Sequence, residues 1–178
     1  MKVFLVRHAQ ADSDVPEGLD DGARPLTGKG RHAAEKHFRS LSKRMHGVDL
    51  VLMSPLVRAV QTAQILALVQ ELDVPLRVHK ALLPDMPVGS QERLLKDHGE
   101  DDLVLVGHNP SIPAMAAHLM SLAQFPRSVP TGSVIALEID TLDEPARIKP
   151  QIAIYTVDKQ PFHHVPEGMP AFERLPQR

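Results

Sequence analysis

The chain contains no cysteine among its 178 residues. Disulfide bonds, zinc sites built from thiolates and cysteine nucleophiles are therefore excluded, and nothing in the composition marks an oxidising compartment. The sequence also has no apolar run near the roughly 18 residues that a membrane-spanning helix needs, and the short apolar stretch after Met1 is too brief for a signal peptide. We therefore expect a cytoplasmic protein with no membrane partner.

An excess of charge of either sign is also missing. The formal net charge is -2 and the sequence pI is about 6.5. A nucleic-acid-binding protein usually carries a basic patch or a basic excess, so we expect no nucleic-acid partner. A mass of 19.6 kDa suits one domain with a sizeable core, and we expect a monomer.

Short apolar runs alternate with helical patterns along the chain. The runs are rich in valine and leucine and are continuous, which indicates strands buried on both faces of a parallel sheet; they cover residues 3–6, 48–53 and 103–106. A further short strand is expected at 76–79, and helices at 30–45, 54–71, 90–98 and 112–123. This order predicts an α/β fold, a three-layer α/β/α sandwich with a mostly parallel central sheet.

The last part of the chain departs from this alternation. Residues 133–139 and 151–157 read as strands with no helix between them, so we expect an antiparallel hairpin at the sheet edge. Residues 158–178 hold four prolines and no periodicity. We therefore predict one domain over residues 1–157, followed by a proline-rich C-terminal tail or strap.

Polar side chains recur where three of the predicted strands end. Arg7 and His8 follow the first strand, Arg58 lies just inside the helix after the second, and His108 follows residues 103–106. Ligands of open parallel sheets bind in the crevice at the carboxyl ends of the strands. We therefore expect two arginines and two histidines to converge on one rim.

This set of side chains suits a phosphoryl group. The guanidinium fork matches phosphate oxygens, and two arginines with a protonated histidine can cover a dianion. The helix start predicted at Ser54-Pro55, with serine as N-cap, adds partial positive charge and aims the arginine. The sequence has no P-loop, no G-x-S-x-G elbow and no H-E-x-x-H motif, so an imidazole is the obvious nucleophile.

Three motifs in order carry a family resemblance: Arg7-His8-Ala9, Ser54-Pro55 with Arg58 and Thr62, and Gly107-His108-Asn109-Pro110. Together they resemble the signature of the histidine phosphatase superfamily, which has the phosphoglycerate mutase-like fold. The short chain without a cap insertion and the RPLTGKG segment at residues 24–30 are most similar to the small bacterial phosphohistidine phosphatases. One departure is Ala9, where the superfamily motif has glycine; we expect alanine to be tolerated unless that position needs a positive φ.

The resemblance implies a metal-independent phosphatase that needs no cofactor. His8 would attack phosphorus and become phosphorylated, and water would then release phosphate. A hydrogen bond from the second ring nitrogen of His8, most simply to a backbone carbonyl, would orient the ring. The residues expected to contact the phosphoryl oxygens are Arg7, Arg58 and His108, with Arg24 and Asn109 as further contacts. Thr62 is expected to serve packing.

The general acid is the open position. Five acidic residues precede Arg24, and Asp21 matches best by its spacing. An imidazole, with a reference pKa of about 6.5, leaves more readily than an alkoxide, so a site with a modest acid suits a P–N bond better than a P–O bond.

We therefore predict a phosphohistidine protein phosphatase whose partner is a phosphohistidine-bearing protein, such as a phosphotransfer domain or carrier. The alternatives are a small-molecule phosphomonoesterase or mutase-like enzyme and, less favoured, a non-catalytic phosphate-binding module.

Overall fold

A central sheet holds the elements that form the site. The computed structural model describes residues 1–41, 44–99, 101–139, 153–155 and 171–172. Its strands are β1 (Lys2–Arg7), β2 (Leu50–Met53), β3 (Leu76–Val78), β4 (Leu103–Gly107), β5 (Val134–Glu138), β6 (Ala153–Tyr155) and β7 (Ala171–Phe172). Its α-helices are α1 (Gly28–Ser40), α2 (Val57–Gln70), α3 (Val88–Asp97) and α4 (Ser111–Leu119).

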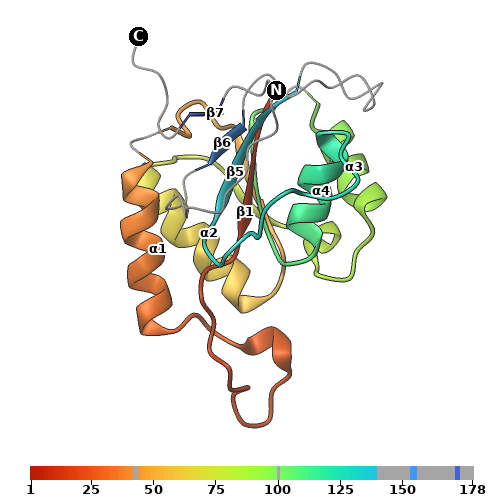
Figure 1. Cartoon of the computed structure of the whole chain (residues 1–178). Coiled ribbons are helices and arrows are strands. Elements are labelled where there is room, and N and C mark those ends of the chain that lie inside the picture. Colours follow the sequence, from red (N-terminus) through yellow and green to blue (C-terminus); the bar gives the residue numbers. More distant parts are fainter. Residues whose placement is uncertain (42–43, 100, 140–152, 156–170, 173–178) are drawn as a thin grey trace.

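The strands of the described residues form one sheet in the order β3-β2-β4-β1-β5-β6-β7. The first four strands of this order run parallel, β5 is antiparallel to both β1 and β6, and β7 is parallel to β6. All the parallel strands point their carboxyl ends the same way, toward the lower edge of the sheet in Figure 1. The predicted mostly parallel sheet with an antiparallel part is confirmed.

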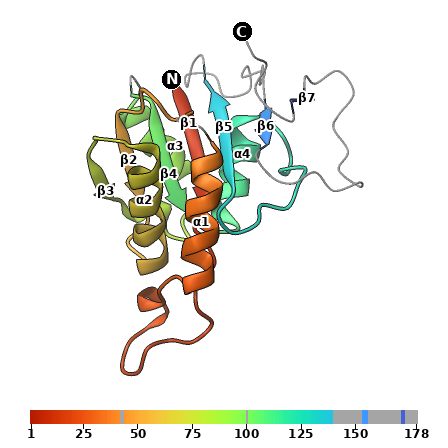
Figure 2. The same cartoon turned by 90° about the vertical axis from the view of Figure 1, so that its left-hand side faces the viewer.

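Helices cover the sheet on both faces, as the three-layer prediction requires. Helices α1 and α2 lie on one face and α3 and α4 on the other (Figures 1 and 2). Successive residues of β1 alternate between the two layers: Val3 and Leu5 pack with α3 and α4, whereas Phe4 and Val6 pack with α1 and α2. Each such side chain contributes about 1.5–3 kcal/mol of hydrophobic stabilisation, so the strands form a rigid mount for the residues that follow them.

All four described helices begin at residues other than those predicted, and local hydrogen bonds explain two of the differences. Helix α1 starts at Gly28 rather than residue 30, because the Thr27 hydroxyl accepts the Gly30 amide at 2.9 Å and caps the helix there. Helix α2 starts at Val57, so the predicted N-cap role of Ser54 is wrong. The amide of Ser54 donates to the carbonyl of Val106 at 3.0 Å and continues the sheet, which delays the helix.

Helix ends also differ from the periodicity. The pattern predicts α4 to residue 123, but it ends at Leu119 because Ser121 takes a positive φ of 53°. Helix α1 ends at Ser40 rather than residue 45, and α3 spans Val88–Asp97 rather than 90–98. None of the helices in the described part of the chain combines the length and the apolar character that crossing a bilayer would require.

The predicted antiparallel pair is present, since β5 pairs with β6. The two strands do not end the sheet, because β7, from within the predicted tail, pairs with β6 on its other side. The rest of residues 158–178 lies outside the described residues, so the domain boundary at residue 157 stays a prediction.

Gly30 allows α1 to lie against the segment that leaves β1. A Cβ atom at Gly30 would stand 2.1 Å from the carbonyl oxygen of Gln10. The same carbonyl accepts the amide of Thr27 at 3.1 Å, so the backbone there cannot retreat without losing a hydrogen bond. The close contact ties the first helix to the segment beyond the first strand.

We predict that Gly30→Ala lowers the free energy of unfolding by about 1–3 kcal/mol, as overpacking does, because its methyl group meets backbone. The matched control is Gly28→Ala on the same helix, where a Cβ meets nothing within 4 Å and no loss is expected. Urea unfolding of both variants measures the difference. Equal stability of the two variants would contradict the close contact.

Candidate active site

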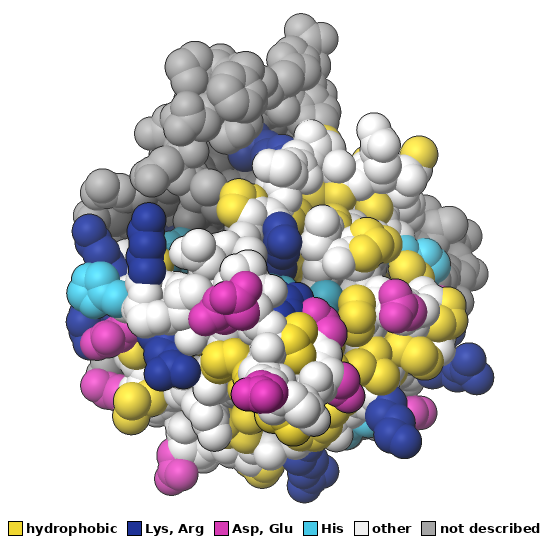
Figure 3. Space-filling model, turned by 90° about the horizontal axis from the view of Figure 1, so that it is seen from below, with side chains coloured by type: hydrophobic (Ala, Val, Ile, Leu, Met, Phe, Trp, Pro, Cys, Tyr) yellow, Lys and Arg dark blue, Asp and Glu magenta, His cyan; other side chains and the backbone are white. Residues whose placement is uncertain are grey.

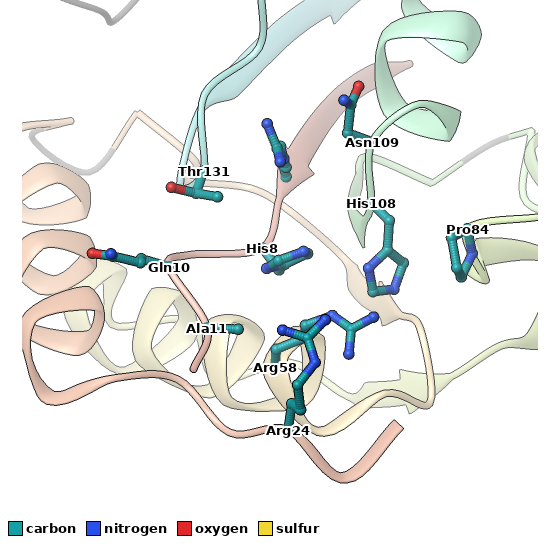
Figure 4. Close-up of a pocket in the computed structure, with 10 residues that line it drawn as sticks. His8, Gln10, Ala11, Arg24, Arg58, Pro84, His108, Asn109 and Thr131 are labelled. Carbon is teal, nitrogen blue, oxygen red and sulfur yellow. The ribbon is translucent and has the colours of Figure 1, made fainter. Parts of the chain in front are cut away.

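The pairing of β1 with β4 places two histidines side by side. Arg7 lies opposite Gly107 in the parallel register, and the amide of His8 donates to the Gly107 carbonyl at 2.9 Å. The residue after each strand is a histidine, and the ring centroids of His8 and His108 are 5.0 Å apart with their planes at 55°. Figure 4 shows both rings with the guanidinium of Arg58, which comes from the first turn of α2.

The ring of His8 is held in one orientation by its own main chain. Its Nδ1 lies 2.7 Å from the carbonyl oxygen of Ala9. A carbonyl can only accept, so Nδ1 carries the hydrogen and the neutral ring keeps its lone pair on Nε2. The orienting bond to a backbone carbonyl that the sequence predicts is present.

His8 is surrounded by features that favour its neutral form. Burial lowers the pKa of His8 from its ordinary 6.5 to about 4. The Ala9 carbonyl acts in the opposite direction, whereas the guanidinium groups of Arg58 and Arg7 lower the pKa further. At neutral pH the Nε2 lone pair is therefore available for attack.

Arg7 is held by a segment that the sequence does not single out. Its Nη1 donates to the carbonyl of Val129 at 2.6 Å, and its backbone amide donates to the carbonyl of Ser133 at 3.0 Å. The amide of Gly132, which has a φ of +80°, lies 3.1 Å from the Arg7 carbonyl and 3.0 Å from that of His8. The Arg7 Nε is buried and has no partner among the described residues, so this donor is available to a ligand.

Asp21 joins the two other arginines of the site. It lies in a short 3-10 turn, Asp21–Ala23, and its carboxylate accepts from Arg58 Nη2 at 3.0 Å and from Arg24 Nε at 2.6 Å. Its carbonyl accepts from Arg58 Nη1 at 2.9 Å. The Arg24 hydrogen bond, together with the charge of Arg58, holds the pKa of the Asp21 carboxyl below its ordinary value. Asp21 is therefore ionised at neutral pH, which suits an ion-pair partner better than a proton donor.

His108 is buried next to His8. Its side chain is 2% exposed, and neither ring nitrogen has a hydrogen bond among the described residues. Burial lowers the pKa of His108 to about 3, and the neighbouring His8 and Arg58 act in the same direction. The sequence predicts a protonated histidine here, whereas burial and the neighbouring cations favour the neutral ring. Its ring can donate one hydrogen bond to a bound anion.

These side chains line a cavity of about 340 Å³. Its lining residues are Arg7, His8, Gln10, Ala11, Arg24, Arg58, Pro84, His108, Asn109 and Thr131. All the predicted site residues are among them except Asp21, which does not line the cavity but forms ion pairs with Arg24 and Arg58. Figure 3 shows this face, with basic and histidine side chains near its centre and acidic ones around them. A cavity with three guanidinium groups suits an oxyanion such as phosphate.

Gln10, Ala11, Pro84 and Thr131 line the cavity but are not predicted from the sequence. Gln10 and Ala11 directly follow the Arg7-His8-Ala9 motif, a signal that could have identified them. Thr131 lies in the loop before β5, where no motif marks it.

Comparison with known proteins agrees with this geometry. The sequence profile of the histidine phosphatase superfamily (branch 1) matches residues 3–84, which include His8 and Arg58. The chain belongs to the histidine phosphatase superfamily. A protein of Picosynechococcus that carries no functional name is 36% identical over 119 residues, covering 63% of this chain and 68% of that protein.

The chain is also similar to proteins named SixA. Phosphohistidine phosphatase SixA of Escherichia coli is 26% identical over 143 residues, covering 79% of this chain and 86% of SixA. A solved structure of the protein histidine phosphatase SixA complexed with tungstate is 26% identical, has a TM-score of 0.70 and covers 79% of this chain and 89% of that chain. The family and these similarities support phosphatase activity.

Alanine in place of the family's glycine does not distort the backbone at residue 9. Ala9 is not among the residues with positive φ, so the position makes no demand that only glycine could meet. Its side chain is 2% exposed and packs with the core on the α1 and α2 face.

We predict that His8 of the free enzyme titrates with a midpoint near pH 4 in an NMR titration of its ring. The pKa is lowered from 6.5, so the neutral form is present above about pH 4 and is lost as the pH falls through that value. The Nε2 lone pair would thus be available throughout the range from about pH 5 to 8. A midpoint close to 6.5 would contradict the buried, arginine-flanked environment.

Proposed function

We propose that the protein hydrolyses phosphohistidine in a protein substrate through a covalent phosphohistidine intermediate on His8. The observation that carries this proposal is the His8 ring, whose Nδ1 hydrogen bond to Ala9 leaves Nε2 as the free base beside an arginine-lined cavity. The similarity to phosphohistidine phosphatase SixA supports the substrate class.

In the first step the Nε2 lone pair of His8 attacks phosphorus in line with the leaving group. A P–N bond to His8 forms while the P–N bond to the substrate histidine breaks. The substrate ring nitrogen keeps the electron pair of the broken bond. The ring leaves as neutral imidazole when its other nitrogen already carries a proton, so no strong acid is required.

In the second step water attacks phosphorus from the side that the substrate imidazole has left. The bond to His8 breaks, Nε2 regains its lone pair and the proton lost by water passes to the phosphate or to solvent. The hydrogen stays on Nδ1, which donates it to the Ala9 carbonyl throughout, so the same tautomer is ready for the next cycle.

The charge on the transferred phosphoryl group would be met by side chains already in place. Arg58 is 5% exposed and fixed by Asp21, and Arg7 is fixed by the carbonyl of Val129, so neither has to reorganise when substrate binds. The free Nε donor of Arg7 and an N–H of His108 would contact phosphoryl oxygens. Arg24, held by Asp21, and Asn109 at the cavity rim are proposed as further contacts.

The ionised state of Asp21 favours a P–N substrate. An alkoxide leaving group needs a proton from a general acid, and a carboxylate paired with two arginines is a weak donor at neutral pH. We propose that Asp21 positions Arg58 and Arg24 and is not the general acid that its spacing suggests. An imidazole leaving group does not need this proton donation from a general acid.

The proposed partner is a phosphotransfer domain or a phosphate-carrier protein in the cytoplasm. Gln10, Asn109 and Thr131 at the cavity are exposed, so a histidine projecting from a folded partner could reach His8. The proposed chemistry uses no metal ion; the described part of the chain contains no group of three or more histidine, aspartate or glutamate side chains that could hold one. The oxyanion tungstate bound by a SixA structure is consistent with an anion-binding site.

We predict that kcat/KM for a histidine-phosphorylated phosphotransfer protein exceeds that for a phosphoserine peptide by about 100-fold or more, the contribution of a missing general acid. A sugar phosphate is the third substrate in the comparison and is expected to be as poor as the peptide. Release of inorganic phosphate measures all three.

Two variants control this comparison. His8→Ala is expected to lose turnover of every substrate, whereas His32→Ala, an exposed histidine on α1, keeps the activity of the wild type. Comparable turnover of phosphohistidine and phosphoserine would overturn the substrate assignment. A sugar phosphate that is preferred by a wide margin would favour the small-molecule phosphomonoesterase.

A further inference from the structure

Thr62 links the nucleophile to the phosphate-binding arginine, although it touches neither the cavity nor a ligand. It lies on α2, one turn after Arg58, and is 0% exposed. Its hydroxyl donates to the carbonyl of Arg58 at 2.6 Å and accepts the amide of Ala9 at 3.0 Å. One oxygen atom therefore joins the backbone that follows His8 to the turn that carries Arg58.

We propose that Thr62 is a positioning residue that sets the place of His8 relative to Arg58. The inference rests on the proposed function, since it assigns a role within that site. It replaces the packing role that the sequence suggests.

The donor and acceptor roles of the hydroxyl are fixed by its partners. The Arg58 carbonyl can only accept, so it takes the single hydroxyl hydrogen, and a lone pair of the oxygen is left facing the Ala9 amide. This bond to the carbonyl one turn back is a common habit of helical threonine. Here this bond also orients the hydroxyl so that its oxygen accepts from the Ala9 amide.

The amide of Ala9 has no sheet partner to replace Thr62. Strand β1 ends at Arg7, and the last sheet-like bond on this side is from the His8 amide to Gly107. Ala9 is 2% exposed, so without the hydroxyl its N–H would be a buried donor with no acceptor. The segment would have to move to satisfy that N–H.

Movement of Ala9 would reach His8 directly. The N–H of Ala9 donates to Thr62, and the C=O of Ala9 accepts from His8 Nδ1. A shift of the Ala9 main chain would therefore move the His8 ring. The chain of contacts runs from the Arg58 carbonyl through the Thr62 hydroxyl and the Ala9 main chain to the imidazole. The orientation of the attacking Nε2 thus depends on a side chain that lies outside the cavity.

Two substitutions separate positioning from packing, because they remove different halves of the side chain. Thr62→Val keeps the branched shape and removes the hydroxyl, whereas Thr62→Ser keeps the hydroxyl and removes the methyl group. A packing role predicts that valine is tolerated and serine is harmful. The positioning role predicts the reverse.

We expect Thr62→Val to lower kcat about 10- to 100-fold with little change in KM, the effect of a reacting group displaced by about 1 Å. Thr62→Ser is expected to keep kcat within about twofold of the wild type. The kinetics use phosphohistidine as phosphoryl donor and are run well below the melting temperature of each variant. Equal kcat for the valine variant and the wild type would overturn the role of Thr62.

Two further measurements keep the test decisive. If Thr62→Val does not fold, the wild type still reports through hydrogen exchange: a slow Ala9 amide supports the bond to Thr62, and exchange at the rate of a solvated loop overturns it. Labelling of the wild type with ³²P-phosphohistidine tests the proposed function separately. No label on the wild type would refute the phosphoenzyme, whereas a labelled wild type with a fully active valine variant would refute only the positioning role.

Discussion

The hydrogen bond from the His8 amide to the Gly107 carbonyl extends the parallel pairing of β1 and β4 one residue beyond the strands. The rest of the site depends on this pairing, because the pairing places the rings of His8 and His108 side by side, with their centroids 5.0 Å apart. Gly107 also lets α4 lie close, since a Cβ there would stand 3.0 Å from the side chain of Ile112. The core on both faces of the sheet makes the strand ends rigid, and rigid strand ends make the spacing of the two rings reproducible.

The electrostatics of the site follow from this geometry. Two imidazoles share a buried space with the guanidinium groups of Arg7 and Arg58, so the pKa of each ring is lowered and both are neutral. The positive charge of the arginines is partly offset by Asp21, which forms an ion pair with Arg58. A phosphoryl dianion, the ligand that we propose, would balance this charge and could accept hydrogen bonds from Arg7 Nε and from the ring of His108. The proposed phosphoryl transfer to nitrogen needs this combination of a neutral imidazole and nearby guanidinium groups.

The core of this site follows from the sequence because its residues sit at strand ends, and a β/α alternation brings such ends together. The contact from Arg7 to the Val129 carbonyl could not be predicted, since it joins residues 122 positions apart and leaves no local motif. The ion pair of Asp21 with Arg58 could not be predicted either, because sequence spacing does not show which of the five acidic residues contacts an arginine. Helix α2 starts later than the capping pattern predicts, because the Ser54 amide donates to the Val106 carbonyl and extends the sheet.

The central claim is our proposal that Nδ1 of His8 donates to the Ala9 carbonyl and thereby leaves Nε2 as the attacking atom. The most direct test is to phosphorylate the ¹⁵N-histidine-labelled enzyme and to identify, by ³¹P–¹⁵N coupling, which ring nitrogen of His8 is bonded to phosphorus. We predict phosphorus on Nε2 of His8. Phosphorus on Nδ1, or on a different histidine, would contradict the claim.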